Sequence, residues 1–187
     1  MITFVSTAYK EKKEANIFLN SLLLQTNENW KCIICCDGKN EYIENVVKNI
    51  NDERIKIHLE NKPNGFWGHK NRKFALENLV DTDFIIQTSI QDYYCPITVS
   101  SILDLSNSFD FIYFNCIHNH QNYRVLNSLI RANSIDWGSF AVRTEIAKKV
   151  GIFDIESGCC DGIFAERCGV YPNIRIFKLD KVLTVHN

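Results

Sequence analysis

The chain has 187 residues, of which 45% are hydrophobic, and a formal net charge of −1. This length fits one domain with a sizeable core, and the composition excludes wholesale disorder. Because the sequence has no basic block, we do not expect nucleic acid to be its main partner.

The N-terminal stretch MITFVSTAYKEKK does not fit a signal peptide, because its apolar run is too short and charged residues begin already at Lys10. No apolar run approaches the ~18 residues that span a membrane. We therefore expect a cytoplasmic protein, either free or held peripherally at the inner face of a membrane. The oligomeric state is left open.

Eight cysteines are present, and Cys32 and Cys35 have CxxC spacing within an apolar run. A second pair at zinc-finger spacing is missing, and strand alternation puts these two thiols on opposite faces. The pattern favours buried free thiols in a reducing compartment over a zinc or redox site.

Strands and helices alternate through the first half of the chain. The pattern predicts strands at 2–5, 31–36, 54–59 and 83–88, and helices at 11–24, 41–50 and 68–79. Such alternation is typical of an α/β fold with a mostly parallel, Rossmann-like sheet flanked by helices. Ligands of these sheets bind beyond the carboxyl ends of the strands.

The second half is less regular. We expect helices at 97–105, 144–150 and 162–167, and strands at 109–115, 137–142, 174–177 and 182–186. No repeat or linker separates the halves, so the sequence predicts a single domain, 1–187.

Polar residues follow several predicted strands. Thr7 and Tyr9 follow the first, Asp37-Gly38 follows the second, and the segment TSIQDYYCP at 88–96 follows the fourth. A carboxylate at such a place can accept hydrogen bonds from a base or a sugar hydroxyl, although Asp-Gly is also typical of a simple turn.

Five segments in chain order resemble family 2 glycosyltransferases of the GT-A fold. They are SLLLQT at 21–26 with WKCIICCDG at 30–38, GHKNRKFA at 68–75, 83–96, VGIFD at 150–154, and VHN at 185–187. The likeness covers nearly the whole chain. It implies a GT-A-like fold whose residues 1–96 bind a nucleotide sugar and whose residues 97–187 bind the acceptor.

The resemblance also implies roles for individual residues. Thr7 and Tyr9 would line the nucleotide pocket, Asp37 would hold the base, and Arg72 would lie near the diphosphate. An aspartate triplet after the fourth strand would place the nucleotide sugar and a divalent metal, with His186 completing the metal shell.

The triplet itself departs from the family pattern. Ser89-Ile90-Gln91-Asp92 stands where the family has Asp-x-Asp-Asp, so only Asp92 keeps its carboxylate. Mn²⁺ and Mg²⁺ prefer charged oxygen donors. Three outcomes are open: Asp92 and His186 bind the metal, cationic side chains such as Arg72 and Lys73 replace it, or the site is inactive.

Transfer of a sugar needs a base for the acceptor hydroxyl and positive charge for the leaving diphosphate. The resemblance favours Asp161 as the base and places Asp136 and Trp137 at the acceptor site, where the indole would stack on a sugar. From the residues alone, Asp161 also reads as a helix N-cap and Asp136 as a turn residue.

The roles of several other side chains stay open. His118 and His120 alternate along a strand and form either a metal pair or surface or acceptor-site side chains, whereas His58 is interpreted as structural. His69, at a helix entry, suits phosphate binding. Phe66-Trp67 either close over the nucleotide or anchor their loop.

We expect a transferase that moves one sugar from a nucleoside-diphosphate donor, most simply a UDP-sugar, to a hydroxyl of a glycan or lipid-linked acceptor. Inversion and a role in polysaccharide biosynthesis follow from the resemblance. The alternative is a non-catalytic nucleotide-sugar-binding module. A nucleotidyltransferase ranks last, because residues 6–10 lack the glycines of a phosphate-binding loop.

Overall fold

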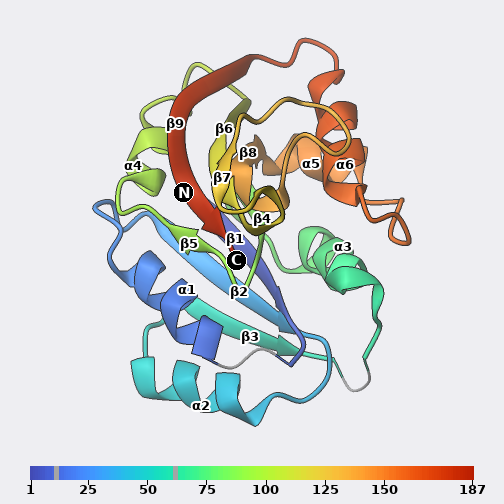
Figure 1. Ribbon diagram of the computed structural model, residues 1–187. Coiled ribbons are helices and arrows are strands. Elements are labelled where there is room, and N and C mark those ends of the chain that lie inside the picture. The colour runs from blue at the N-terminus through green and yellow to red at the C-terminus, as the bar shows by residue number, and fades with distance from the viewer. Residues whose placement is uncertain (11–12, 61–62) are drawn as a thin grey trace.

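The computed structural model describes residues 1–10, 13–60 and 63–187. Within this part the strands form a nine-stranded sheet in the order β3-β2-β1-β4-β8-β6-β9-β5, with β7 paired to β6 (Figure 1). Helices cover both faces of the sheet. The predicted α/β architecture, with a central sheet flanked by helices, is therefore confirmed.

Four parallel strands build the first half of the sheet. They are β1 (Ile2–Ala8), β2 (Trp30–Cys36), β3 (Ile55–Leu59) and β4 (Phe84–Ser89). β1 lies between β2 and β4 and is buried along its whole length, including its polar residues Thr3, Ser6 and Thr7. All four strands therefore present their carboxyl ends at one edge.

The second half of the chain completes the sheet with mixed pairing. β8 (Phe140–Arg143) runs antiparallel to β4, β6 (Phe111–His118) antiparallel to β8, and β9 (Ile176–His186) parallel to β6. The short strands β5 (Tyr93–Tyr94) and β7 (Arg124–Leu126) pair with β9 and β6. The end of the chain thus returns to the carboxyl edge of the parallel strands.

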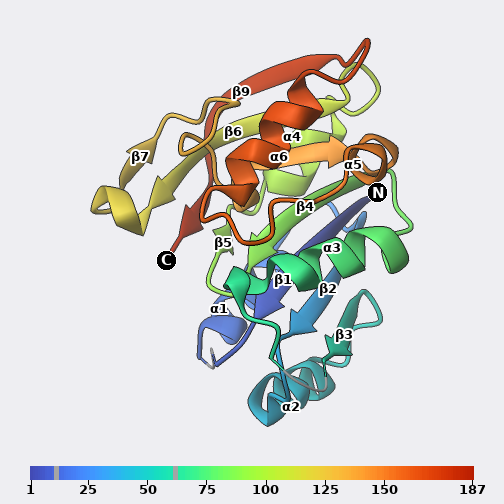
Figure 2. The same ribbon diagram turned by 90° about the vertical axis from the view of Figure 1, so that its right-hand side faces the viewer.

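The helices separate into two layers, each packed on its own apolar cluster. On one face lie α1 (Lys13–Leu23), α2 (Glu41–Ile50) and α4 (Thr98–Leu103). On the other lie α3 (His69–Asn78), α5 (Thr144–Val150) and α6 (Cys160–Gly169), which are turned toward the viewer in Figure 2. Short 3₁₀ turns η1 (Phe66–Gly68), η2 (Asn119–Gln121) and η3 (Trp137–Ser139) lie in the connections.

The predicted boundaries hold best where the apolar rhythm is strong, as at α2 and α5. Residues 137–142 were expected to be one strand, but Asp136 forms a capping box that starts η3 and delays β8 to Phe140. The two strands expected at 174–177 and 182–186 are one strand, β9, with a register shift opposite Asn115. The expected start of the first helix, at residues 11–12, lies outside the described residues.

The thiols of Cys32 and Cys35 belong to opposite apolar clusters, as predicted from alternation. Burial, followed by the nearby Cys36, raises the pKa of Cys35 to about 12, which keeps the thiol protonated. Across the residues that the structure describes, no helix is both long and apolar enough to cross a membrane.

Candidate functional site

A cavity of about 670 Å³ opens where the carboxyl ends of β1, β2 and β4 meet the end of β9. Lys73 does not line it, whereas eleven of the candidate site residues do: Thr7, Tyr9, Asp37, Arg72, Ser89, Gln91, Asp92, Asp136, Trp137, Asp161 and His186. The structure therefore brings together residues that are up to 179 positions apart, and none of these residues lies on a separate surface.

Asp37 holds the loop that forms one edge of the cavity. Its carboxylate accepts hydrogen bonds from the backbone of Asn64 (2.6 Å) and Gly65 (3.0 Å) and from the side chain of Asn71 (3.3 Å). Both oxygens are thus engaged with the chain. The expectation that Asp37 also holds a nucleotide base stays a prediction.

The same loop contains four successive residues with positive φ, from Gly65 (68°) through Phe66 (52°) and Trp67 (51°) to Gly68 (74°). For the two aromatic residues this costs on the order of 1–2 kcal/mol each. A Cβ on Gly68 would lie 2.7 Å from the Cβ of Thr7, so the loop passes against β1 too closely for a side chain. Trp67, 68% exposed, is thereby held at the cavity mouth.

Arg72 lies beneath the cavity with its guanidinium almost fully buried. Its two terminal nitrogens donate to the backbone oxygens of Trp67 (2.7 Å) and Thr88 (2.8 Å), while Nε has no partner. Burial lowers the pKa of Arg72, and Asp136, Asp92 and Asp161 oppose this shift. The guanidinium therefore supplies fixed positive charge among the acidic groups of the site.

Asp92 is almost fully buried, and both of its oxygens are engaged. Tyr94 donates to Thr88, and Thr88 donates to Oδ2 of Asp92, which also accepts from the backbone of Ser89 (2.9 Å). Oδ1 accepts from Nδ1 of His186 at 2.7 Å. The predicted neighbours Asp92 and His186 do meet, but the carboxylate contacts the imidazole where the sequence predicted a shared metal ion.

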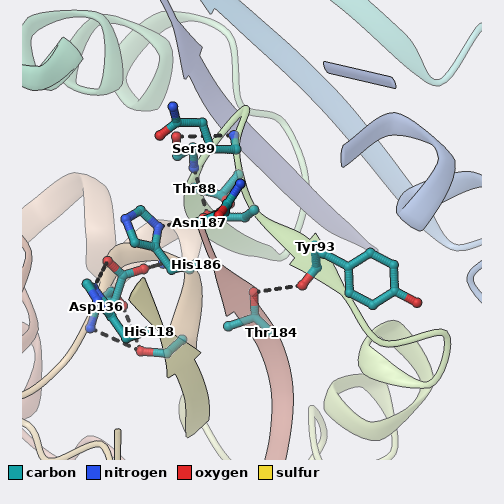
Figure 3. Close-up of polar contacts among 12 residues, drawn as sticks. Thr88, Ser89, Tyr93, His118, Asp136, Thr184, His186 and Asn187 are labelled. Carbon is teal, nitrogen blue, oxygen red and sulfur yellow. Dashed lines mark hydrogen bonds and ion pairs between the residues drawn. The ribbon is translucent and has the colours of Figure 1, made fainter. Parts of the chain in front are cut away.

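The group with metal-binding geometry is His118, Asp136 and His186, whose donor atoms all lie within 4.8 Å of one another. The three side chains converge from the end of β6, from the residue before η3 and from the end of β9 (Figure 3). His118 and His186 are register partners on neighbouring parallel strands, with ring centroids 4.6 Å apart. Joint binding of a metal by Asp92 and His186 stays a prediction, beside this second candidate group.

This outcome also changes the reading of Asp136 and His118. Asp136 was assigned to the acceptor site, yet it lies 3.7 Å from Nε2 of His118 and caps η3 through the backbone of Gly138. A metal pair of His118 with His120 was one of two open interpretations, and the side chain of His120 lies outside what the structure describes. Although burial opposes ionisation, the contacts with His118 and His186 lower the pKa of Asp136.

His186 carries a shifted pKa for a similar reason. Burial alone would lower it, but the hydrogen bond and charge of Asp92, together with the charge of Asp136, raise the pKa of His186 to about 9. The imidazole and the two carboxylates therefore form one electrostatic unit at the end of β9.

Asp161 lies in the first turn of α6, where Cys159 occupies the N-cap position. The N-cap reading of Asp161 is therefore wrong. Burial, followed by the charge of Asp136, raises the pKa of Asp161 to about 6. A carboxylate with this pKa is ionised at neutral pH and is more basic than an ordinary aspartate, which suits a general base.

His69, at the start of α3, belongs to the site more closely than its sequence indicates. Its ring is buried between Trp67 and Trp137, lines the cavity, and has no hydrogen-bond partner at either nitrogen. Burial, followed by the charge of Arg72, lowers the pKa of His69 to about 4. A neutral, unpartnered imidazole can bind a ligand hydroxyl or phosphate oxygen.

Trp137 contributes little ring surface to the cavity. It is 6% exposed and packs against Phe140 and Phe164, with Arg72 lying 5.6 Å from the ring centroid. Stacking of Trp137 on an acceptor sugar stays a prediction. The more exposed aromatic ring at the cavity mouth is that of Trp67.

Comparisons with known proteins agree with this arrangement. Residues 3–88 match the model of Glycosyl transferase family 2. No curated protein matches the chain at a significant level. Among solved structures, S. aureus TarS 1-349 superposes with a TM-score of 0.82 at 17% identity, covering 100% of this chain and 60% of that one.

Two other solved structures share the fold. The mannosyltransferase PcManGT from Pyrobaculum calidifontis, in complex with GDP-Man and Mn²⁺, has a TM-score of 0.76 at 13% identity over 99% of this chain and 56% of that one. GalNAc-T7, with UDP, GalNAc and Mn²⁺, has a TM-score of 0.73 at 10% identity over 100% and 43%. The chain thus spans about 60% or less of the length of these proteins.

The sheet order, the cavity at its carboxyl edge and these superpositions define the GT-A glycosyltransferase fold. Within that class, the segment from β1 to β4 matches glycosyl transferase family 2. The family resemblance predicted from the sequence is confirmed over residues 3–88, and the superpositions show the fold.

Proposed function

We propose that the cavity binds a nucleoside-diphosphate sugar, most simply a UDP-sugar, and that the enzyme transfers the sugar with inversion to a hydroxyl of a glycan or lipid-linked acceptor. The observation that carries this proposal is the convergence of Asp37, Arg72, Asp161 and His186 on one cavity at the carboxyl edge of the sheet. Such an edge is where open α/β sheets bind their ligands.

The cavity suits a ligand of this class in size and chemistry. Its volume of about 670 Å³ lies within the roughly 300–1,000 Å³ of small-molecule sites. Solved structures of S. aureus TarS with UDP and with UDP-GlcNAc support a UDP-sugar donor, although PcManGT was solved with GDP-Man. The identity of the sugar rests on hydrogen bonds such as those that His69 is free to make.

Arg72 and Asp161 supply the two charges that sugar transfer requires. As the glycosidic bond breaks, negative charge grows on the diphosphate, and the pre-positioned guanidinium of Arg72 offsets it without reorganisation. Asp161 accepts the proton of the attacking hydroxyl. A divalent cation, Mn²⁺ or Mg²⁺, would add further positive charge at the diphosphate when bound.

One observation favours the alternative, a nucleotide-sugar-binding module without catalysis. The strand-end segment, residues 89–92 after β4, presents the neutral side chains of Ser89 and Gln91 to the cavity where a triplet of acids is expected. The carboxylate of Asp92 accepts hydrogen bonds from Thr88 and His186. Binding and turnover therefore have to be measured separately.

Calorimetric titration with UDP, and UDP release from UDP-GlcNAc and other UDP-sugars, separate the two functions. The transferase proposal expects UDP binding together with slow UDP release that Asp161→Asn lowers by a factor of about 10²–10⁴. Asp104→Asn, an exposed acid at the end of α4, is the matched control and should leave turnover unchanged.

UDP binding without release in any metal, and equal behaviour of Asp161→Asn and the wild type, would establish the binding module instead. Absence of binding by any nucleoside diphosphate would reject both functions.

A further inference from the structure

The fold family implies a divalent cation at the diphosphate, and the chain offers two places for it. The strand-end segment after β4 presents two neutral side chains, Ser89 and Gln91, to the cavity. The carboxylate of Asp92 already accepts hydrogen bonds from Thr88, Ser89 and His186. A metal ion there would have to break this buried network, so the strand-end segment does not suit the ion.

From these contacts we infer that the cation is held by His118, Asp136 and His186, at the ends of β6 and β9 and the start of η3. Each of the three offers one donor atom, and each lines the cavity. This inference deepens the proposed function, on which it rests for the identity of the bound diphosphate.

The distances support the assignment. Donor atoms that share an ion at about 2.1 Å lie about 3.0–3.4 Å apart. Nε2 of His118 and Oδ2 of Asp136 are separated by 3.7 Å, and the whole group fits within 4.8 Å. Small side-chain rotations therefore suffice to close the group around an ion.

The contacts behind the group support it further. Metal-binding histidines usually donate their other ring nitrogen to a carboxylate, which fixes the ring and its tautomer. His186 donates from Nδ1 to Asp92, so Nε2 is the nitrogen left for a ligand. Asp92, with Thr88 and Tyr94 behind it, is then a positioning residue for His186.

The chemistry of the donors indicates which ions suit the site. Two imidazole nitrogens and one carboxylate oxygen favour Mn²⁺, Co²⁺, Fe²⁺ or Zn²⁺ over Mg²⁺, which prefers oxygen ligands. Three protein ligands leave positions open toward the cavity, where diphosphate oxygens would complete the shell. The site would thus replace the lost triplet with ligands from the second half of the chain.

Binding of Mn²⁺ to the protein, measured by electron paramagnetic resonance with and without UDP, tests the inference without any turnover. Co²⁺ absorption in the visible range reports nitrogen ligation independently. We expect one Mn²⁺ per chain, tighter with UDP, and affinity at least about 100-fold lower in His118→Ala and Asp136→Asn. Asp92→Asn should lower the affinity by about 10–100-fold, as expected for the residue that orients a ligand.

Two controls keep the outcome interpretable. His58→Ala removes an imidazole that contacts a carboxylate, Glu60, at 3.2 Å but lies outside the cavity, and it should bind Mn²⁺ as the wild type does. Thermal unfolding of His118→Ala and of the milder His118→Gln verifies that loss of metal is not loss of fold.

The inference is overturned if either His118→Ala or Asp136→Asn binds Mn²⁺ as tightly as the wild type. It is equally overturned if Asp92→Asn loses more affinity than His118→Ala, or if the wild type binds neither Mn²⁺ nor Co²⁺ at millimolar concentration. Binding of Mn²⁺ at these residues without any binding of UDP would instead reject the proposed function and leave the metal site standing.

Discussion

Replacement of Asp161 by Asn should make the protein more stable at neutral pH while it lowers turnover. The side chain of Asp161 is largely buried near Asp136, and these two causes raise the pKa of Asp161 from 3.8 to about 6. At about 1.4 kcal/mol for each pKa unit, keeping this carboxylate ionised costs the folded state about 3 kcal/mol. Asn removes the charge and keeps an oxygen that accepts the hydrogen bond from the backbone of Gly162.

The sign of the pH dependence follows from the raised pKa. Between pH 4 and pH 6 the folded state binds more protons at Asp161 than the unfolded state, so the free energy of unfolding falls as pH rises through this window. Below pH 4 both states are protonated and the cost disappears. Asp161→Asn should therefore match the wild type near pH 3.5 and exceed it by up to about 3 kcal/mol at pH 7.5.

Urea unfolding of both proteins at pH 3.5, 5 and 7.5 measures this difference, and Asp104→Asn serves as the exposed control. A difference that does not vary with pH would refute the reasoning, because it would show that the charge of Asp161 is not the cause. Lower stability of Asp161→Asn at pH 7.5 would show that the carboxylate makes contacts worth more than its burial costs.

Three further substitutions test other parts of the structure. Gly68→Ala should lower the free energy of unfolding by about 3 kcal/mol, because φ is +74° and the new Cβ would lie 2.7 Å from the Cβ of Thr7. A free energy of unfolding equal to that of the wild type would contradict the loop geometry. Trp67→Ala should change the free energy of unfolding by no more than about 0.5 kcal/mol, because the ring is 68% exposed. It should nevertheless weaken the binding of UDP about 10-fold in calorimetry, and unchanged affinity would leave the ring only an anchoring role. Asp110→Asn should cost about 2 kcal/mol at pH 7, because hydrogen bonds from Arg175 hold the pKa of Asp110 well below 3.8. That stabilisation is present above pH 4 and is lost as pH falls below it, so urea unfolding of the two proteins should converge toward pH 2; a constant difference would contradict it.

The sequence predicts the first half of this fold well, for a physical reason. β2 is buried on both faces, so its nearly continuous apolar run is unambiguous, and the amphipathic pattern at 41–50 matches α2 residue for residue. Parallel strands joined by helices also fix where the carboxyl ends meet. The convergence of Thr7, Asp37 and Asp92 on one cavity was predictable on that ground alone.

The second half is less predictable because its structure depends on contacts distant in sequence. β5 and β7 are too short to leave a pattern and form only by pairing with β9 and β6. The 3₁₀ turn at 137–139 depends on a capping box whose Asp also reads as an ordinary turn residue. Local propensity does not distinguish these cases.

The grouping of His118 with His186 has the same origin. The two histidines are 68 residues apart and become neighbours only because β9 runs parallel to β6 in a register that aligns them. A register one residue different would turn the ring of His186 to the other face of the sheet and away from Asp136. The position of a late histidine was recognisable from the sequence, but its partners were not.

The role of Asp92 follows from this difference. A carboxylate at a strand end can bind a cation directly only while its oxygens face the cavity, and both oxygens of Asp92 accept hydrogen bonds from protein groups. Gly138 makes this possible, because a Cβ there would lie 2.9 Å from Oδ2 of Asp92. The residue that the sequence retains from the acidic triplet is therefore buried behind an imidazole. Loss of the other two acids need not remove the metal, provided that the ligands it requires come from β6, β9 and the start of η3.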